Sequence, residues 1–234
     1  MYKKLLTRLF YCFFIVFTLH ASAQNKAGIS KRILYVFRKD FKDRPYDELV
    51  KHHLDSLGYA VTFADAAEPV TVSKGYDLII ISATVSARML GGKYANVNIP
   101  VLTWEDDIQD DMRYTGRYKG VDFGKVEKEH YIWLVNAPHP MSGGLPAGIA
   151  VAFNDDQSIG WGHPGKGDSI IATLPGQPEK AVIYGYQKGA TMDYDFLAPE
   201  KRTMFFLDNR NFGLMTKSGL ALFDAAVAWT IQKN

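Results

Sequence analysis

Cysteine is almost absent from this sequence of 234 residues, since Cys12 is the only one. It lies in an N-terminal apolar segment that we predict to be removed. A mature chain without that segment forms no disulfide, binds no zinc through a thiolate and has no cysteine nucleophile. The composition therefore excludes a disulfide-stabilised scaffold and a thiol enzyme.

The N-terminal apolar run is too short to cross a bilayer as a helix. Leu9–Leu19 has 11 residues, whereas a membrane-spanning helix needs about 20. Basic residues precede this run, and the small residues Ala21-Ser22-Ala23 follow it. This order predicts a secretory signal peptide over residues 1–23, cleaved before Gln24, and an exported protein that is periplasmic or secreted. An uncleaved membrane anchor is the alternative.

The mature chain also lacks a surplus of positive charge. Removal of Lys3, Lys4 and Arg8 with the leader lowers the basic residues from 27 to 24 against 25 acidic ones, so the formal charge falls from +2 to −1. No basic run remains that would indicate binding to nucleic acid or to an anionic membrane surface. We expect a small polar molecule as the partner, with no nucleic acid and no membrane after signal cleavage. The oligomeric state stays open.

What the sequence contains is an alternation of short β-rich runs and helical patterns. Residues 24–31 form a flexible lead-in, and residues 32–234 show no internal linker, which indicates one domain. The expected strands are Arg32–Phe37, Tyr59–Ala64, Tyr76–Ser82, Ile99–Trp104, Tyr131–Val135, Ile149–Phe153, Ser169–Leu174, Ala181–Tyr186 and Thr203–Leu207. The expected helices are Tyr46–Leu57 and Thr216–Lys233, the latter capped by Thr216 or Ser218. This order is typical of a doubly wound α/β fold with extra β-structure in the C-terminal half.

Four segments resemble the class I glutamine amidotransferase-like superfamily, and more closely its ThuA-like (trehalose-utilisation) branch with exported relatives. They are Tyr76–Ser82, Ile99–Glu105, the H-P-M-S-G-G-L-P segment His139–Pro146, and the closing helix Gly219–Ile231. The resemblance implies a flavodoxin-like three-layer sandwich with a mostly parallel sheet.

The sequence departs from that superfamily at the nucleophile elbow. Working amidotransferases carry a pattern such as P-V-L-G-x-C-x-G, and Pro100-Val101-Leu102 match its start. Thr103 then stands where glycine is expected, Glu105 where cysteine is expected and Asp107 where the next glycine is expected. Larger and acidic residues would crowd the tight turn and repel an oxyanion. The resemblance therefore predicts the fold without glutamine hydrolysis.

Ligands of parallel α/β sheets bind at the carboxyl ends of the strands, where Glu105 follows Ile99–Trp104. With Asp106, Asp107, Asp110 and Asp111 it forms an acidic cluster. The cluster is interpreted as a polar floor for a neutral hydroxylated ligand, as an oxygen-ligand site for a divalent cation, or as a solvated helix start. Trp104 is interpreted as a stacking platform for a sugar ring or as a core residue.

Other candidate ligand residues lie in loops. Ser82 and Thr84 follow a strand and either hold a polar ligand or cap a helix. His139 and His163 are acid, base or ligand candidates, with turn residues as the alternative. Asn209 follows the last predicted strand and is a candidate for the rim of the site.

These residues support three hypotheses. The first is an exported, non-catalytic amidotransferase-like domain that binds a small polar ligand of the carbohydrate type through Ser82, Thr84, Trp104, Glu105, Asp106, His139, His163 and Asn209, without a metal or cofactor. The second is a hydrolase or isomerase in which Glu105 pairs with His139 or His163 as acid and base. The third is a structural or interaction domain, which predicts a broad exposed apolar patch.

Overall fold

The computed structural model describes residues 30–208 and 210–232. The predicted signal peptide, most of the lead-in, Asn209 and Lys233 lie outside these residues. Within them, no helix combines the length and the apolar character that crossing a membrane requires.

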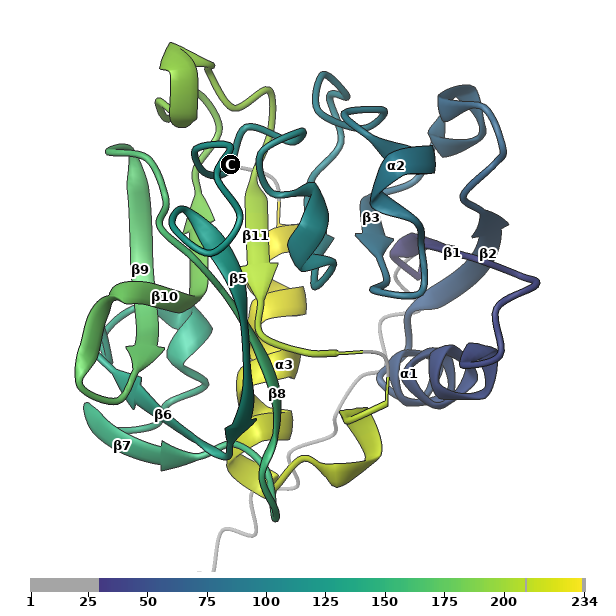
Figure 1. Ribbon diagram of the computed structural model, residues 1–234. Coiled ribbons are helices and arrows are strands. Elements are labelled where there is room, and N and C mark those ends of the chain that lie inside the picture. Colours follow the sequence, from purple (N-terminus) through teal and green to yellow (C-terminus); the bar gives the residue numbers. More distant parts are fainter. Residues whose placement is uncertain (1–29, 209, 233–234) are drawn as a thin grey trace, which may run out of the picture.

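A parallel sheet forms the first half of the molecule (Figure 1). Its strands are β1 (Arg32–Phe37), β2 (Ala60–Asp65), β3 (Leu78–Ile81), β4 (Val101–Thr103) and β11 (Arg202–Phe205), in the order β2-β1-β3-β4-β11. All four residues of β3 are buried, because the sheet is covered on both faces. Every carboxyl end of this parallel set lies at the same edge of the sheet.

Antiparallel strands extend the sheet beyond β11. They are β10 (Gln177–Tyr186), β9 (Asp168–Leu174), β6 (Tyr131–Leu134) and β7 (Gly148–Val151), followed outward in that order. Two further strands, β5 (Phe123–Glu129) and β8 (Gln157–Gly162), pair with each other, and β8 also meets β10. The sheet has 11 strands among the described residues.

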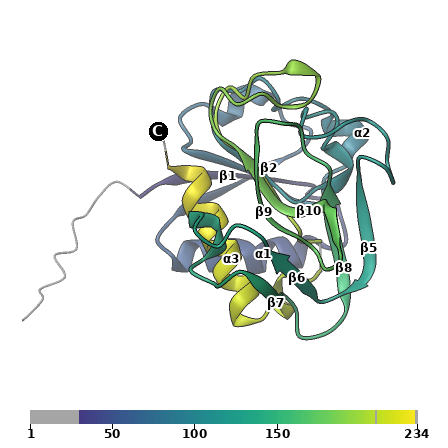
Figure 2. The ribbon, with the colours of Figure 1, turned by 90° about the vertical axis from the view of Figure 1, so that its left-hand side faces the viewer.

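Helices cover the two faces of the sheet (Figure 2). Helices α1 (Arg44–Ser56) and α3 (Lys217–Ile231) contribute Val50, Leu54 and Phe223 to one apolar core. The opposite face is covered by the short helix α2 (Ala87–Leu90) and by loops. The helix contributes Leu90 to a second core, and a loop contributes Tyr114. This three-layer arrangement confirms the flavodoxin-like fold with extra β-structure.

The predicted strands all have counterparts, but β5 and β8 were missed. The sequence of β5, FGKVEKE, is mostly polar, and that of β8, QSIGWG, contains two glycines. Neither segment shows the apolar pattern from which strands are predicted. Trp161 and Gly162 end β8. The prediction that Thr216 caps the last helix is confirmed, because its Oγ1 accepts a hydrogen bond from the backbone N–H of Gly219 at 3.0 Å.

Candidate functional site

Glu105 lies directly beyond the carboxyl end of β4, at the first turn of a short 3-10 helix, η2 (Asp106–Ile108). Its Oε1 accepts a hydrogen bond from the backbone N–H of Asp107 at 3.2 Å. The hydroxyl of Thr103 accepts from the N–H of Glu105 at 3.0 Å and donates to the carbonyl of Ile81 on β3 at 3.1 Å. Thr103 therefore fixes the turn in place of the glycine that an amidotransferase elbow would carry.

An open pocket of about 490 Å³ lies at this edge of the sheet. The loop after β3 and the start of α2 form one wall, and η2 and β5 form the other. The lining residues are Ala83, Val85, Ser86, Ala87, Arg88, Glu105, Asp106, Asp107 and Lys125. The pocket therefore brings together acidic, basic and hydroxyl side chains from three separate segments of the chain.

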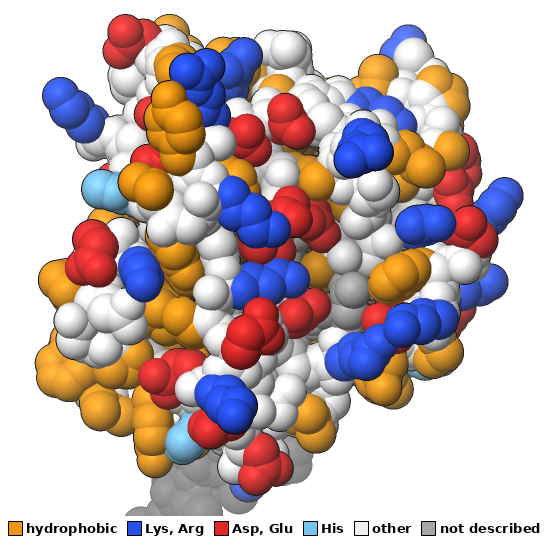
Figure 3. All heavy atoms as spheres, in the orientation of Figure 1, with side chains coloured by type: hydrophobic (Ala, Val, Ile, Leu, Met, Phe, Trp, Pro, Cys, Tyr) orange, Lys and Arg blue, Asp and Glu red, His pale blue; other side chains and the backbone are white. Residues whose placement is uncertain are grey.

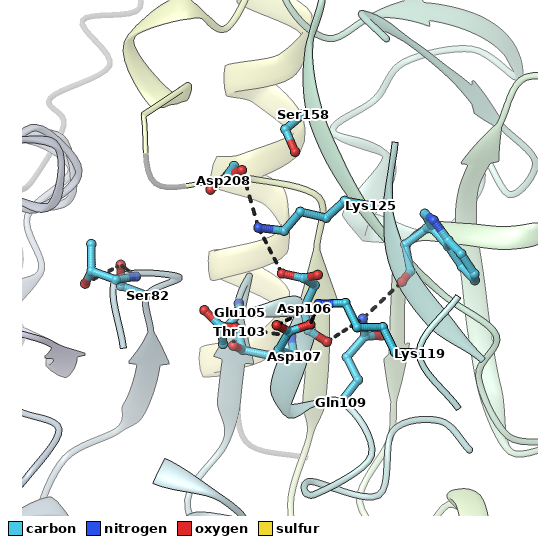
Figure 4. Close-up of polar contacts among 12 residues, drawn as sticks. Ser82, Thr103, Glu105, Asp106, Asp107, Gln109, Lys119, Lys125, Ser158 and Asp208 are labelled. Carbon is cyan, nitrogen blue, oxygen red and sulfur yellow. Dashed lines mark hydrogen bonds and ion pairs between the residues drawn. The ribbon is translucent and has the colours of Figure 1, made fainter. Parts of the chain in front are cut away.

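Lys125 on β5 ties the acidic residues together (Figure 4). Its Nζ lies 3.0 Å from Oδ1 of Asp106 and 3.4 Å from Oδ2 of Asp208. Burial opposes the charge of Lys125, but the two carboxylates outweigh it and raise the pKa of this lysine. Lys119 forms a separate ion pair with Asp107: its Nζ lies 2.6 Å from Oδ1 of Asp107 and 2.9 Å from Oδ2.

Burial and neighbouring charge favour the neutral form of Glu105. The residue is only 6% exposed, and burial followed by the negative charge of Asp106 raises its pKa well above the ordinary value of 4.5. Burial also raises the pKa of Asp106, although Lys125 opposes that shift. A neutral carboxyl group both donates and accepts hydrogen bonds, whereas a carboxylate only accepts them.

The acidic cluster does not act as one unit. Asp110 and Asp111 line a different pocket of about 450 Å³, together with Arg113, Arg117 and others. In the part of the chain that the structure describes, no three His, Cys, Asp or Glu side chains are grouped so that they could hold a metal ion. Lys125 and Lys119 pair with Asp106 and Asp107 at the place where the cation-site interpretation puts a metal ion.

The expectation that Trp104 stacks on a sugar ring is also wrong. Trp104 is 2% exposed and belongs to the core beneath α3. Its ring lies against Tyr35 and Phe223, with centroid distances of 5.8 and 5.9 Å. Side chains alternate across a strand and its extension, so the residue before Glu105 points into the core while Glu105 reaches the pocket.

Ser82 and Thr84 do not face a ligand either. Both hydroxyls donate to the carboxylate of Asp47 on α1, at 2.5 Å and 3.0 Å, and both residues are buried. The hydroxyl of Tyr35 donates to the same carboxylate at 2.9 Å. These hydrogen bonds join α1 to the end of β3. Ser82 and Thr84, expected as ligand residues, are therefore structural residues.

The two histidines lie away from the pocket, and neither of them lines it. The ring of His139 lies 5.3 Å from that of Trp229, which also contacts the ammonium of Lys201. The carbonyl of Lys201 accepts from the N–H of Val101 at the start of β4. His139 therefore lies at the amino edge of the sheet, opposite Glu105, and is no acid or base partner for it.

His163 follows the end of β8 and is exposed, with its backbone N–H bonded to the carbonyl of Asp122. Asn209 lies outside the described residues, but its neighbours border a second hollow of about 340 Å³, lined by Asp43, Gln157, Ser158, Asp208, Arg210 and Asn211. Asp208 in the lining of this hollow forms an ion pair with Lys125 in the lining of the pocket of Glu105 (Figure 4).

Sequence reasoning missed Lys125 and Arg88 as site residues. Lys125 was missed because β5 was not predicted as a strand, and its contacts span 19 residues to Asp106 and 83 to Asp208. Ser86 begins α2 without making a capping hydrogen bond. Its position just after the predicted strand Tyr76–Ser82 was the signal in the sequence for that wall of the pocket.

The fold and the site define a flavodoxin-like α/β domain with a carboxyl group at the turn after β4. Among solved structures, a putative ThuA-like protein from Bacteroides uniformis is similar, with a TM-score of 0.59, 14% identity and coverage of 92% of this chain and 96% of that one. A putative GMP synthase subunit from Thermoplasma acidophilum gives a TM-score of 0.54, 13% identity, and coverage of 86% and 94%. At such identity the likeness shows the fold. A scan of family models and a search of curated proteins found no match.

Proposed function

We propose that this chain is an exported, non-catalytic amidotransferase-like domain that binds a small hydroxylated ligand of the saccharide class in the pocket beside Glu105. The observation that carries the proposal is the position of the Glu105 carboxyl group, at the ligand edge of the sheet and in the wall of an open polar pocket. Export is proposed from the predicted signal peptide.

The chemistry of the pocket supports a ligand with several hydroxyl groups. Such a ligand both donates and accepts hydrogen bonds, and the pocket offers both kinds of partner. Asp106 and Asp107 accept, Arg88 and Lys125 donate, and Ser86 does either. The ion pairs of Asp106 and Asp107 with lysines reduce the net charge of the wall, which favours a neutral ligand over a cation.

The same geometry disfavours the alternative of an acid–base enzyme. General acid–base catalysis requires groups within hydrogen-bond reach of one substrate or one bridging water. Neither His139 nor His163 lines the pocket of Glu105. The residues at the turn also disfavour acyl transfer, because Glu105 offers a carboxyl group where that chemistry uses a thiol.

Isothermal titration of the exported protein with a panel of neutral mono- and disaccharides tests the proposal. We expect binding that weakens about tenfold in Glu105→Ala, as for the loss of a hydrogen bond worth about 1.4 kcal/mol. Glu105→Gln should bind nearly as well as the native protein, because the amide replaces a neutral carboxyl group with a donor and an acceptor. Glu48→Gln, on the exposed surface of α1, is the matched control and should not change affinity. Absence of binding to every saccharide would refute the proposal.

A further inference from the structure

The outer face of the β6–β7 hairpin is apolar and exposed. Along both strands the side chains alternate, so that Ile132, Leu134 and Ala150 are buried. The residues between them point outward and remain exposed. These are Tyr131, Trp133, Ile149 and Val151, at 38%, 45%, 59% and 41%, followed by Val135 at 47%. Scattered exposed apolar residues are common, but five on one face are not.

These five residues, which we call the hairpin face, are contiguous because of the strand register. Tyr131 pairs with Val151, and Trp133 pairs with Ile149. Paired side chains on one face of antiparallel strands lie about 5 Å apart. Hydrophobic side chains gather at this corner of the molecule in Figure 3, where Figure 1 places β6 and β7. None of the five is charged. Contiguous apolar surface of this kind marks an interaction site.

An apolar groove of about 370 Å³ adjoins the hairpin face. Its lining consists of Trp133, Val135, Thr173, Leu174, Gly176 and Pro178. The strand order β9-β6-β7 places this groove on the β9 side of Trp133 and the protruding Ile149 on the other side. A projection and a groove thus flank Trp133 on one surface. A twofold interface requires such a self-complementary surface. In it, residue i of the first copy contacts residue j of the second, and residue j of the first contacts residue i of the second.

The free edge of β7 is a poorer contact than this face. The carbonyl of Val151 accepts a hydrogen bond from the Thr216 hydroxyl at 2.5 Å. Thr216 begins α3 and thereby occupies the edge at that residue, so another strand cannot pair there without breaking this contact. The hydrogen bond favours packing through the side chains of the face over extension of the sheet.

We propose that a second copy of this chain packs against the hairpin face, with Ile149 of each copy inserted into the apolar groove of the other. The exposed parts of the five side chains amount to roughly 450 Å², taking side-chain areas of roughly 150–250 Å². A stable dimer buries about 800 Å² per partner, of which about 65%, or roughly 500 Å², is apolar. The area of the hairpin face therefore matches one side of a dimer. This proposal is independent of the ligand pocket at the carboxyl edge.

Sedimentation-velocity centrifugation of the exported protein over a range of about 1–100 µM tests the dimer. We expect a dimer whose dissociation constant rises at least tenfold in Ile149→Lys and in Trp133→Ser. Val121→Lys, at a residue that is 68% exposed and lies outside the hairpin face, is the matched control and should dimerise as the native chain does. Circular dichroism verifies that each variant is folded.

Ile149→Ser keeps the test decisive if the lysine variant does not fold, because it removes the apolar projection without adding charge. A native chain that stays monomeric throughout the range overturns the proposal. A dimer that both variants leave intact also overturns it, as does a monomer that binds phosphatidylcholine vesicles through Trp133, detected as a shift in tryptophan fluorescence.

Discussion

Lys125 and Asp106 form an ion pair, with Nζ 3.0 Å from Oδ1, that joins a strand of the antiparallel extension to the ligand edge of the parallel sheet. The Asp106 side chain is 3% exposed and that of Lys125 is 28% exposed. Lys125 also contacts Asp208 in the loop that follows β11. One lysine therefore holds together three segments that surround the pocket of Glu105.

Replacement of Lys125 by methionine should lower the free energy of unfolding at pH 7. The variant keeps most of the side-chain volume but leaves the buried Asp106 without its cation, which we expect to cost about 2 kcal/mol after allowance for the partial exposure of the lysine. Urea denaturation measures the change. Lys119→Met is the control, because its partner Asp107 is 40% exposed and such a pair contributes about 0–1 kcal/mol. Equal effects of the two substitutions would contradict the structural role of Lys125.

Glu105 should make stability depend on pH. Its pKa in the folded state is raised by burial above the ordinary value of 4.5, so the folded protein binds this proton more tightly than the unfolded chain. The stabilisation is fully present below about pH 4.5 and is lost as the pH rises through the folded-state value. Glu105→Gln removes this dependence. The free energy of unfolding of the variant minus that of the native protein should therefore increase from pH 4.5 to 7.5, as measured by denaturation at each pH. A constant difference would contradict the raised pKa.

Asp47 should matter for stability and not for ligand binding. Replacement by alanine leaves the buried hydroxyls of Tyr35, Ser82 and Thr84 without their acceptor, which we expect to cost about 3 kcal/mol. Ser82→Ala removes one donor and should cost about 1 kcal/mol. Thermal unfolding measures both changes. Saccharide affinity of folded Ser82→Ala should equal that of the native protein, and a large loss of affinity would restore Ser82 as a ligand residue.

Trp104 should behave as a core residue. Trp104→Ala removes a ring packed between Tyr35 and Phe223 and should lower the free energy of unfolding by about 3–5 kcal/mol. Trp104→Phe keeps an aromatic ring and should be destabilised less. Titration of folded Trp104→Phe with saccharides should give native affinity. A selective loss of binding in a variant of native stability would show that this ring contacts the ligand.

The sequence predicted most of the fold because local patterns carry it. The run of isoleucines in β3, Pro45 in the first turn of α1 and Thr216 at the start of α3 each specify their element through nearby residues. The polar β5 and the glycine-containing β8 were missed because their strand character depends on their pairing with each other and with β10. The position of Glu105 followed from counting along β4. The positions of Lys125 and His139 relative to the pocket could not be predicted in this way, because no local sequence pattern specifies them.

The sequence by itself determined that residues 24–234 contain no cysteine, that they alternate between strands and helices, and that a carboxyl group follows β4. These properties depend on composition and on periodicity over a few residues. The tertiary structure alone decided that Trp104 is a core residue, that Asp47 accepts hydrogen bonds from the hydroxyls of Ser82 and Thr84, and that Lys125 forms an ion pair with Asp106. It also brought together the five exposed side chains of the hairpin face. Each of these depends on contacts between residues far apart in the chain, which form only when the sheet assembles.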